Sequence, residues 1–493
     1  MIFRQTFFEK QYFLLLLPVF FLLHGIVENY PLIAVSDCLV LFGTYLLATI
    51  VIAVVAFLLL RSWRTAAMLS FFIMAFHFFF GPAHDFLKNL FGTSFITKYS
   101  FLLPFILVAF VLLIIYLKRK KPDFYKFSRY INVLLLVLIL IDLSRLAFDA
   151  VRDSSAKSTT TATAARCESC ERPDIYLIIA DEYAGKKELD EVFHFDNSAF
   201  YIQLRNRGFF IVDSSFGNYN YTPFSMASML SMNYLDKLEG RNKSLNDRNL
   251  CYRTINSNAL IDFFKSQDYE LKNCSIFQFA GKLPFASTPF YMTGVDLITA
   301  QTFLSRINRD IRFNLVTRLK IRSETERALK EELRINEELY KRAWDEATTS
   351  SERPRFVYTH LEMPHYPYYF DRNGKPNQIK DLWDSEQWDL KKYIGYLQYA
   401  NKKYLELIDH ILKNSEKPPV VIFMSDHGFR EFVGDSVDHG YHYMNINSIH
   451  LPNKQYQGFY KGMSNVNQFR VLLNTEFKQN LPMLKDSTIF LKE

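Results

Sequence analysis

The strongest constraint on the fold is a series of long apolar runs in the first 150 residues of the 493-residue chain. Each run is close to the ~20 residues that an α-helix needs to cross a membrane. The run at 65–82 is the least regular, because His77 interrupts it and Gly81-Pro82 ends it. We predict five membrane spans, at 11–28, 37–60, 65–82, 99–117 and 130–148.

Basic residues in the intervening loops predict the orientation, because short loops rich in lysine and arginine stay in the cytoplasm. Ten such residues lie before the first span, between the second and third, and between the fourth and fifth. The other two loops hold only Lys88 and Lys98. We therefore expect a multi-pass protein of the bacterial inner (cytoplasmic) membrane, with everything after about residue 150 on the periplasmic, extracytoplasmic side.

Charge and cysteine content fit this topology. The net charge of +7 partly reflects the cytoplasmic loops, and no basic stripe indicates a nucleic-acid partner. Cys38 lies in a predicted span, whereas the exported part holds four cysteines, an even number that predicts disulfides. The favoured pairing is Cys167–Cys170 with Cys251–Cys274. A zinc half-site at "CESC" is disfavoured, because no second CxxC or HxxxH follows.

The rest of the chain has the pattern of an α/β domain. Three β-rich runs, "DIYLIIADEY", "RFVYTHLEMPH" and "PPVVIFMSDHG", each break into polar residues and alternate with helical stretches. This alternation predicts a mainly parallel sheet whose ligands gather at the carboxyl ends of the strands. We divide the chain into a five-helix transmembrane domain (1–150), a Ser/Thr/Ala-rich linker (151–172) and an exported domain (173–493).

Two of these strand ends carry metal-ligating side chains. Asp181 and Glu182 follow the first run, and Asp426 and His427 follow the last, before the turn residue Gly428. Carboxylates combined with an imidazole suit Zn²⁺ or Mn²⁺. Alone, "DE" after a strand is a weak signal and favours a helix N-cap, so a metal site also needs the second pair.

A nucleophile could come from "FGNYNYTPFSMASMLSMNYL" (216–235), where a helix is expected to begin near Pro223 with Thr222 as its N-cap. The simpler interpretation is that Thr222 only caps this helix while its serines and methionines pack. The alternative is that its hydroxyl meets a phosphate at the positive helix end, where a divalent ion would activate it.

Taken together, "IIADE", "TPFSMASM" and "IFMSDHG" behind five spans resemble the alkaline phosphatase and sulfatase superfamily. The most similar branch is that of membrane-anchored phosphoethanolamine transferases and lipoteichoic acid synthases, and the resemblance covers roughly residues 173 to 453. It implies one divalent metal, zinc rather than manganese, and Thr222 as the nucleophile. The metal ligands it implies are Glu182, Thr222, Asp426 and His427, with Asp181 as an additional one.

The resemblance also implies histidines that hold the phosphoryl group or act as acid and base. His365 matches one such position, while His439 and His442 compete for a second, and the spacing does not decide between them. Ser225, one turn after Thr222, is expected to support the substrate by hydrogen bonding. His360, within the strand, is expected to be a satisfied core residue.

The expected function is transfer of phosphoethanolamine or phosphoglycerol from a membrane phospholipid to an envelope lipid or glycan, through a phospho-threonine intermediate. A phosphatase, phosphodiesterase or sulfatase-like hydrolase is the first alternative; a non-catalytic receptor or transporter with a decayed exported domain is the second. Sulfate-ester hydrolysis is disfavoured, because Thr222-Pro223-Phe224-Ser225-Met226 replaces the Cys/Ser-x-Pro-x-Arg motif of sulfatases. The chain also lacks the Ser-Val-Pro turn of the transferases, so its acceptor or subfamily can differ.

Overall fold

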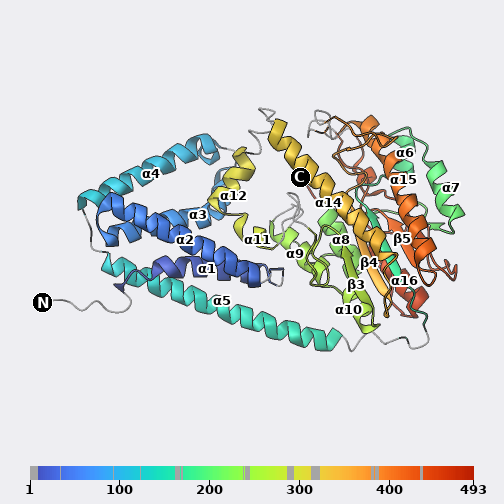
Figure 1. Ribbon diagram of the computed structural model, residues 1–493, viewed down its shortest axis with the longest axis horizontal. Helices are drawn as coiled ribbons and strands as arrows, with labels where there is room; N and C mark the ends of the chain where they lie inside the picture. The colour runs from blue at the N-terminus through green and yellow to red at the C-terminus, as the bar shows by residue number, and fades with distance from the viewer. Residues whose placement is uncertain are drawn as a thin grey trace. The chain divides into compact units, whose positions relative to one another are not determined.

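The computed structural model forms two compact units. It describes residues 9–492 except 31, 34, 93, 121, 123, 161–166, 168, 169, 237, 239–244, 286–293, 313–321, 379–381, 383–387 and 433–436. The first unit consists of Met1–Ser155 together with Met292–Arg322, and the second of Ala156–Tyr291 together with Ser323–Glu493 (Figure 1).

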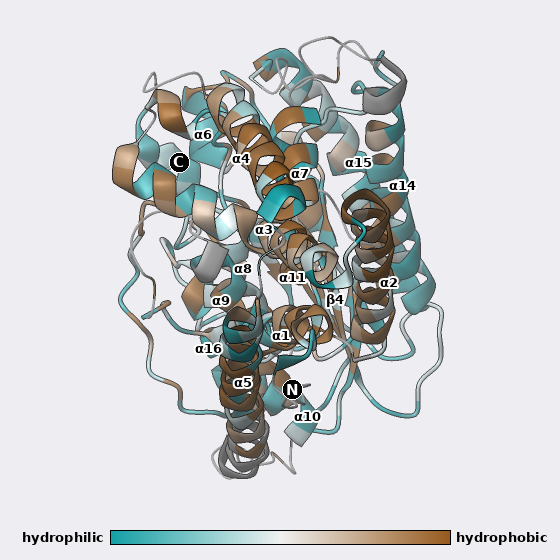
Figure 2. Cartoon of the chain, turned by 90° about the vertical axis from the view of Figure 1, so that its left-hand side faces the viewer, coloured by the Kyte–Doolittle hydropathy of each residue, from teal (hydrophilic) through white to brown (hydrophobic). Residues whose placement is uncertain are grey.

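The first unit is helical and apolar. Four of its helices are long and apolar enough to cross a membrane, and α1 is apolar but shorter. Much of their surface is exposed hydrophobic side chain, and α2 and α4 are brown in the hydropathy colouring of Figure 2. These helices anchor the protein in a membrane. The bounds are α1 (Phe13–Glu28), α2 (Val35–Leu60), α3 (Trp63–Phe91), η2 (Phe95–Thr97), α4 (Tyr99–Lys120) and α5 (Tyr125–Thr160).

The third span does not end at Gly81-Pro82, as we predicted, because α3 continues through Pro82 to Phe91. Proline cannot donate the usual helical hydrogen bond, and a helix tolerates it where a neighbour pairs with the nearby backbone groups. Here the N–H of Gly81 donates to the carbonyl of Gln301, 2.9 Å away. Gln301 lies between α11 (Asp296–Thr299) and α12 (Phe303–Ile307), which the π-helical turn η3 (Asn308–Arg312) follows.

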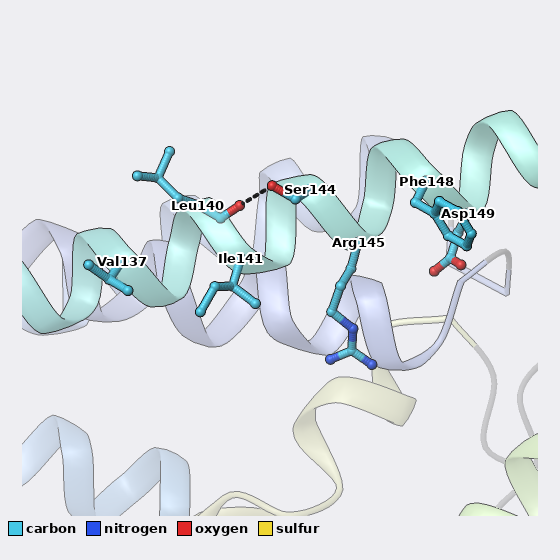
Figure 3. Close-up of a pocket in the computed structure, with 7 residues that line it drawn as sticks. All are labelled: Val137, Leu140, Ile141, Ser144, Arg145, Phe148 and Asp149. Carbon is cyan, nitrogen blue, oxygen red and sulfur yellow. Dashed lines mark hydrogen bonds between the residues drawn. The ribbon is translucent and has the colours of Figure 1, made fainter.

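Helix α5 carries charged residues at its C-terminal half. Arg145 pairs with Glu28 of α1 at 3.1 Å, and Asp142 lies 3.2 Å from Nδ1 of His24. Figure 3 shows Arg145 beside a shallow pocket along α5, lined with exposed apolar side chains such as Ile141 and Phe148. The helix also extends to Thr160, so the first part of the predicted linker is helical rather than irregular.

The second unit is built on a six-stranded sheet in the order β2-β6-β5-β1-β4-β3. Strands β1, β3, β4 and β5 are parallel to one another, whereas β6 pairs antiparallel with β5 and β2 pairs antiparallel with β6. The predicted α/β class and mainly parallel sheet are therefore confirmed. The bounds are β1 (Ile175–Ala180), β2 (Phe210–Ile211), β3 (Glu270–Cys274), β4 (Arg355–Leu361), β5 (Val420–Met424) and β6 (Asn447–His450).

The central strands β1, β4 and β5 are buried along their whole length, which explains why β1 and β5 are continuous apolar runs rather than alternating ones. Helix α15 buries an aromatic stripe that includes Tyr393, Tyr396 and Tyr404. Burying such a side chain contributes about 1.5–3 kcal/mol. The helices of this unit are α6 (Lys186–Glu191), α7 (Ser198–Asn206), α8 (Thr222–Ser231), α9 (Leu245–Asn256), α10 (Ala259–Ser266), α14 (Arg322–Glu346), α15 (Leu390–Asn414), η6 (His439–Tyr443) and α16 (Asn465–Phe477).

One of the two favoured disulfides forms. Cys167 and Cys170 are bonded, which removes them as a zinc half-site. Cys251 and Cys274 are free and buried, so the second predicted pair is wrong. Cys251 lies within α9 and Cys274 ends β3, and burial raises the pKa of both thiols, so each behaves as a small core residue.

Candidate active site

The three predicted strand ends meet at one edge of the sheet. Strand β1 lies between β4 and β5 in parallel, so the residues that follow all three strands emerge side by side. The N–H of Asp181 donates to the carbonyl of Leu361 at 3.1 Å, and the N–H of Glu182 donates to Oδ1 of Asp426 at 3.1 Å. Residues 244 positions apart thus share one hydrogen-bond network.

Asp181, Asp426 and His427 form what we call the metal group. One ligand atom of each lies within 4.8 Å of the other two, and all three side chains are at most 1% exposed. Oδ2 of Asp426 is buried and accepts no hydrogen bond within the described chain, although His427 Nε2 lies 3.2 Å away. Two buried carboxylates beside one imidazole leave negative charge that a cation would balance, so this donor set fits a divalent metal.

The Thr222 hydroxyl faces the metal group. Its Oγ1 lies 3.2 Å from Nε2 of His427 and 3.4 Å from Oδ1 of Asp181. Thr222 is the first residue of α8, and Tyr221 is its N-cap, so the expected capping role of Thr222 is wrong. Because its hydroxyl caps no backbone N–H, it is available at the positive end of the helix, where an anion is favoured.

Several buried contacts hold α8 against the end of β5. The Ser225 hydroxyl donates to the carbonyl of Asp426 at 2.7 Å, and Nδ2 of Asn465 donates to the same carbonyl at 2.9 Å. A Cβ at Gly217 would lie 2.4 Å from that carbonyl oxygen, so only glycine allows this approach. Ser225 therefore braces the ligand-bearing turn. Sequence reasoning missed Gly217 and Asn465, for which no local pattern gave a signal.

Glu182, His365 and Glu431 form a second cluster, which we call the Glu182 group. One ligand atom of each lies within 4.8 Å of the other two, and Nε2 of His365 is 3.6 Å from Oε2 of Glu182. The Glu182 backbone is left-handed (φ 57°), which turns its carboxylate away from the Asp181 side chain. The structure thus brings together Asp181, Asp426, His427 and Thr222, and places the Glu182 carboxylate in a neighbouring cluster.

Arg430 links the Glu182 group to the start of α8. Its backbone N–H donates to Oε1 of Glu182 at 3.1 Å, and its guanidinium lies over the ring of Tyr221 at 4.5 Å. Sequence reasoning missed Arg430 and Glu431, although both follow the "SDHG" turn. Their position directly after that turn was the available signal.

The site perturbs the pKa values of its carboxylates in opposite directions. Burial raises the pKa of Glu182 to about 8, against the opposing charges of His365 and Arg430. Burial acts in the same direction on Asp181, but a hydrogen bond from His360 and the charge of His365 outweigh it, so the pKa of Asp181 is lowered. Of these two carboxylates, Asp181 is therefore the one that stays ionised at lower pH.

The pKa values of His427 and His365 are also shifted in opposite directions. Burial lowers the pKa of His427, which favours the neutral imidazole that binds metals. Burial also disfavours the charged form of His365, but the carboxylates of Glu182 and Asp181 outweigh it and raise the pKa of His365 to about 9. A protonated His365 is thus the counter-charge of the Glu182 group in the metal-free protein.

His360 does more than fill the core. It is fully buried on β4, with Nε2 3.3 Å from Oδ2 of Asp181 and Nδ1 3.1 Å from the Tyr358 hydroxyl. If the Tyr358 hydroxyl donates to Nδ1, Nε2–H donates to Asp181, which orients this member of the metal group. The sequence predicts only a satisfied core residue at His360; the signal for its second role is its place on the strand that pairs with β1.

His439 and His442 both lie on η6. The His439 ring packs against Phe490 at 4.4 Å between centroids, and the His442 carbonyl accepts the Gly428 N–H at 2.9 Å. Segment η6 is therefore adjacent to the turn that carries His427. Neither imidazole belongs to the two ligand clusters found among the described residues.

The sulfatase family profile matches residues 197–468, which is more than half of the chain. The chain belongs to the sulfatase family. The superfamily predicted from the motifs around Asp181, Thr222 and His427 is thereby confirmed. No curated protein matches this sulfatase-family chain.

Several solved structures are similar at low identity. The C-terminal periplasmic domain of EcEptC from Escherichia coli is 12% identical with a TM-score of 0.39, over 63% of this chain and 84% of that chain. The corresponding domain of phosphoethanolamine transferase EptC from Campylobacter jejuni is 13% identical with a TM-score of 0.36, over 62% and 90%. A phosphonate monoester hydrolase of Agrobacterium radiobacter is 14% identical with a TM-score of 0.36, over 62% and 74%.

Proposed function

We propose that this protein transfers a phospholipid head group, phosphoethanolamine or phosphoglycerol, to an envelope lipid or glycan through a phospho-threonine intermediate on Thr222. The observation that carries the proposal is the position of the Thr222 hydroxyl. It lies at the start of α8, caps no backbone N–H of that helix, and is 3.2 Å from Nε2 of His427. A hydroxyl in such surroundings is suited to nucleophilic attack on a phosphorus atom.

In the first half-reaction, Oγ1 of Thr222 forms a bond to phosphorus and the bond from phosphorus to the diacylglycerol oxygen breaks. Diacylglycerol leaves with the proton that Thr222 loses. In the second half-reaction, an acceptor hydroxyl attacks the same phosphorus, and Thr222 recovers a proton as its ester bond breaks. In both halves the phosphate oxygens would lie at the positive end of the α8 dipole, which favours their negative charge.

Asp181, Asp426 and His427 would hold the divalent metal, with Thr222 as a further ligand. We propose zinc rather than manganese, because a buried imidazole and few carboxylates suit zinc. Such an ion lowers the pKa of a bound hydroxyl and stabilises charge on phosphate oxygens. His360 orients Asp181, while Ser225 and Asn465 fix the Asp426 backbone.

The membrane unit supports a lipid donor. A catalytic domain tethered to apolar helices meets phospholipid head groups at the bilayer surface, whereas a soluble phosphodiester would require no anchor. The basic loop residues support a multi-pass protein of the inner membrane whose catalytic domain lies on the extracytoplasmic side. The acceptor would then be an envelope lipid or glycan on that side.

The remaining histidines complete the proposal. His365 would act on the phosphoryl group from the Glu182 side of the site, 3.6 Å from Oε2 of Glu182. His439 and His442 remain competing candidates for an acid or base in the second half-reaction, since η6 adjoins the His427 turn. Ser225 would act through Asp426 rather than on substrate, because its hydroxyl is already donated to the Asp426 carbonyl.

The decisive experiment is intact-mass analysis of the full-length protein purified from membranes and incubated with phospholipid vesicles. We expect an adduct on Thr222 whose mass identifies the head group, and no adduct on Thr222→Ala. The hydrolase alternative is supported instead if no phospholipid yields an adduct while soluble phosphodiesters are turned over. Unchanged metal content in Asp426→Ala would refute the metal assignment.

A further inference from the structure

A segment that lies between two elements of the second unit in the sequence packs on the membrane helices instead. Met292–Arg322 separates β3 from α14 in the chain, yet it belongs to the first unit. Its helix α12 packs against α3 (Figure 1), and the ring of Phe303 lies 4.8 Å from that of Phe76 and 5.1 Å from that of Phe80. Because the second unit is extracytoplasmic, this end of α3 faces the same side of the membrane.

Polar contacts fix α12 and η3, together residues 303–312, which we call the α12–η3 segment. Arg306 is only 5% exposed; its guanidinium pairs with Asp85 of α3, and its Nε donates to Oε1 of Gln301 at 3.0 Å. Asp310 accepts a hydrogen bond from the hydroxyl of Tyr99, the first residue of α4. Contacts with two membrane helices therefore hold the segment in place, so its outward side chains have a defined position at the helix ends.

The sequence of this region combines basic and apolar residues. Residues 303–322 contain six arginines and lysines but only one acidic residue, Asp310. Apolar residues recur at every fourth position from Phe303 to Leu319, a spacing typical of one face of a helical segment. A basic amphipathic segment of this kind is typical of proteins that lie on an anionic membrane surface.

The outward side chains of the α12–η3 segment have the same two characters. Leu304 is 65% exposed, and Phe95 of the neighbouring turn η2 is 63% exposed. Arg309 and Arg312, both on η3, are exposed as well. Large apolar side chains are unfavourable in water, whereas at a bilayer surface they enter the acyl layer while guanidinium groups meet lipid phosphates.

Positive charge exceeds negative charge at this end of the helices. Among the described residues of the segment, Asp310 is shared between two arginines, 2.8 Å from Nε of Arg309 and 4.0 Å from Arg306. Two exposed lysines add to the excess, Lys88 in the last turn of α3 and Lys98 directly before α4. The arrangement therefore favours an anionic partner at the depth of the lipid head groups.

We propose that the α12–η3 segment binds the head groups of anionic phospholipids in the extracytoplasmic leaflet. Arg309 and Arg312 hold the lipid phosphate through charge-assisted hydrogen bonds, and Leu304 contacts the acyl chains. This site attaches the chain between β3 and α14 to the bilayer, in addition to the membrane helices themselves. The inference goes beyond the proposed transferase function and does not rest on it.

Brominated lipids test the site in the full-length protein carrying Leu304→Trp. Two nanodisc preparations contain the same mixture of phosphatidylglycerol and phosphatidylcholine, with bromine on the acyl chains of one lipid or of the other. Bromine quenches tryptophan fluorescence on contact, and the signal of the native tryptophans is subtracted with protein that lacks the substitution. We expect brominated phosphatidylglycerol to quench about threefold more strongly, because the arginines enrich the anionic lipid around the segment.

Arg309→Gln combined with Arg312→Gln should make quenching by the two lipids equal, since the segment stays at the bilayer but loses its head-group preference. High salt should weaken the preference of the unsubstituted segment, because it screens exposed charges. The matched control is Arg119→Gln combined with Arg129→Gln, which removes the same charge from exposed positions outside the segment and should leave the preference intact.

Three results would overturn the inference. Absence of quenching by either brominated lipid would show that Leu304 does not face the bilayer. Equal quenching by both lipids with Arg309 and Arg312 present would show that the segment does not select anionic head groups. A preference that persists in the Arg309→Gln, Arg312→Gln variant would show that these arginines do not form the site.

Discussion

The Thr222 hydroxyl lies 3.2 Å from Nε2 of His427, although 205 positions separate the two residues in the chain. The first is at the start of α8 and the second follows β5, and the Ser225–Asp426 hydrogen bond ties these two elements together. This relationship makes Thr222 the best-placed nucleophile among the described hydroxyls.

Replacing Thr222 tests the nucleophile directly. Thr222→Ala should lower transferase activity at least a hundredfold, since the attacking oxygen is lost. It should still bind metal, because Asp181, Asp426 and His427 remain. Thr222→Ser keeps the hydroxyl and should retain measurable activity and the adduct. Activity in Thr222→Ala equal to that of wild type would rule out the phospho-threonine pathway.

Removing the metal should abolish activity. We expect chelation to inactivate the enzyme and lower its thermal midpoint, and added Zn²⁺ to restore both, because buried carboxylates lose their counter-charge without it. Asp426→Asn should lower metal content measured by atomic spectroscopy, whereas Asp236→Asn, an exposed aspartate, should not. Equal metal content in the two variants would contradict the assignment.

Gly217→Ala should disrupt the site without touching a ligand. Its Cβ would lie 2.4 Å from the Asp426 carbonyl oxygen, closer than a backbone contact allows, so α8 or the β5 turn must shift. We expect a lower thermal midpoint and reduced metal affinity. Gly395→Ala is the matched control. Gly395 lies within helix α15, and the nearest atom to a Cβ there would be 3.7 Å away. Alanine is also favoured over glycine in a helix by about 1 kcal/mol. A tolerated Gly217→Ala would show that this close approach is dispensable.

The metal-free protein should lose stability as pH rises. Folding raises the pKa of Glu182 from 4.5 to about 8, so the folded state keeps a proton that the unfolded state releases in that window. His365 acts in the same sense, with its pKa raised from 6.5 to about 9. The lowered pKa of His427 acts in the opposite sense below pH 6.5, so the thermal midpoint of the metal-free protein should fall between about pH 7 and pH 9.

Glu182→Gln should flatten this dependence, because it removes one titrating group and the carboxylate that raises the pKa of His365. Glu416→Gln, an exposed control before β5, should leave the curve unchanged. A midpoint that rises with pH over this range in the metal-free wild type would contradict both shifts.

Sequence alone determined the elements whose signals are local. Apolar runs of membrane-spanning length, three buried strands and the polar residues at their ends follow from periodicity and composition, and α2, β1, β4 and β5 lie where these patterns placed them. Parallel strands bring their carboxyl ends to one edge, so the meeting of Asp181 and Asp426 also followed from the pattern.

Only the tertiary structure decided which side chains share a site. The left-handed backbone of Glu182 separates its carboxylate from that of Asp181, which neighbouring letters in the sequence cannot reveal. Helix α3 continues beyond Pro82, where the N–H of Gly81 pairs with the carbonyl of Gln301. His360, Asn465 and Gly217 contact the site from distant segments of the chain. These features depend on long-range contacts and single backbone angles, whereas periodicity records only the average face that each element buries.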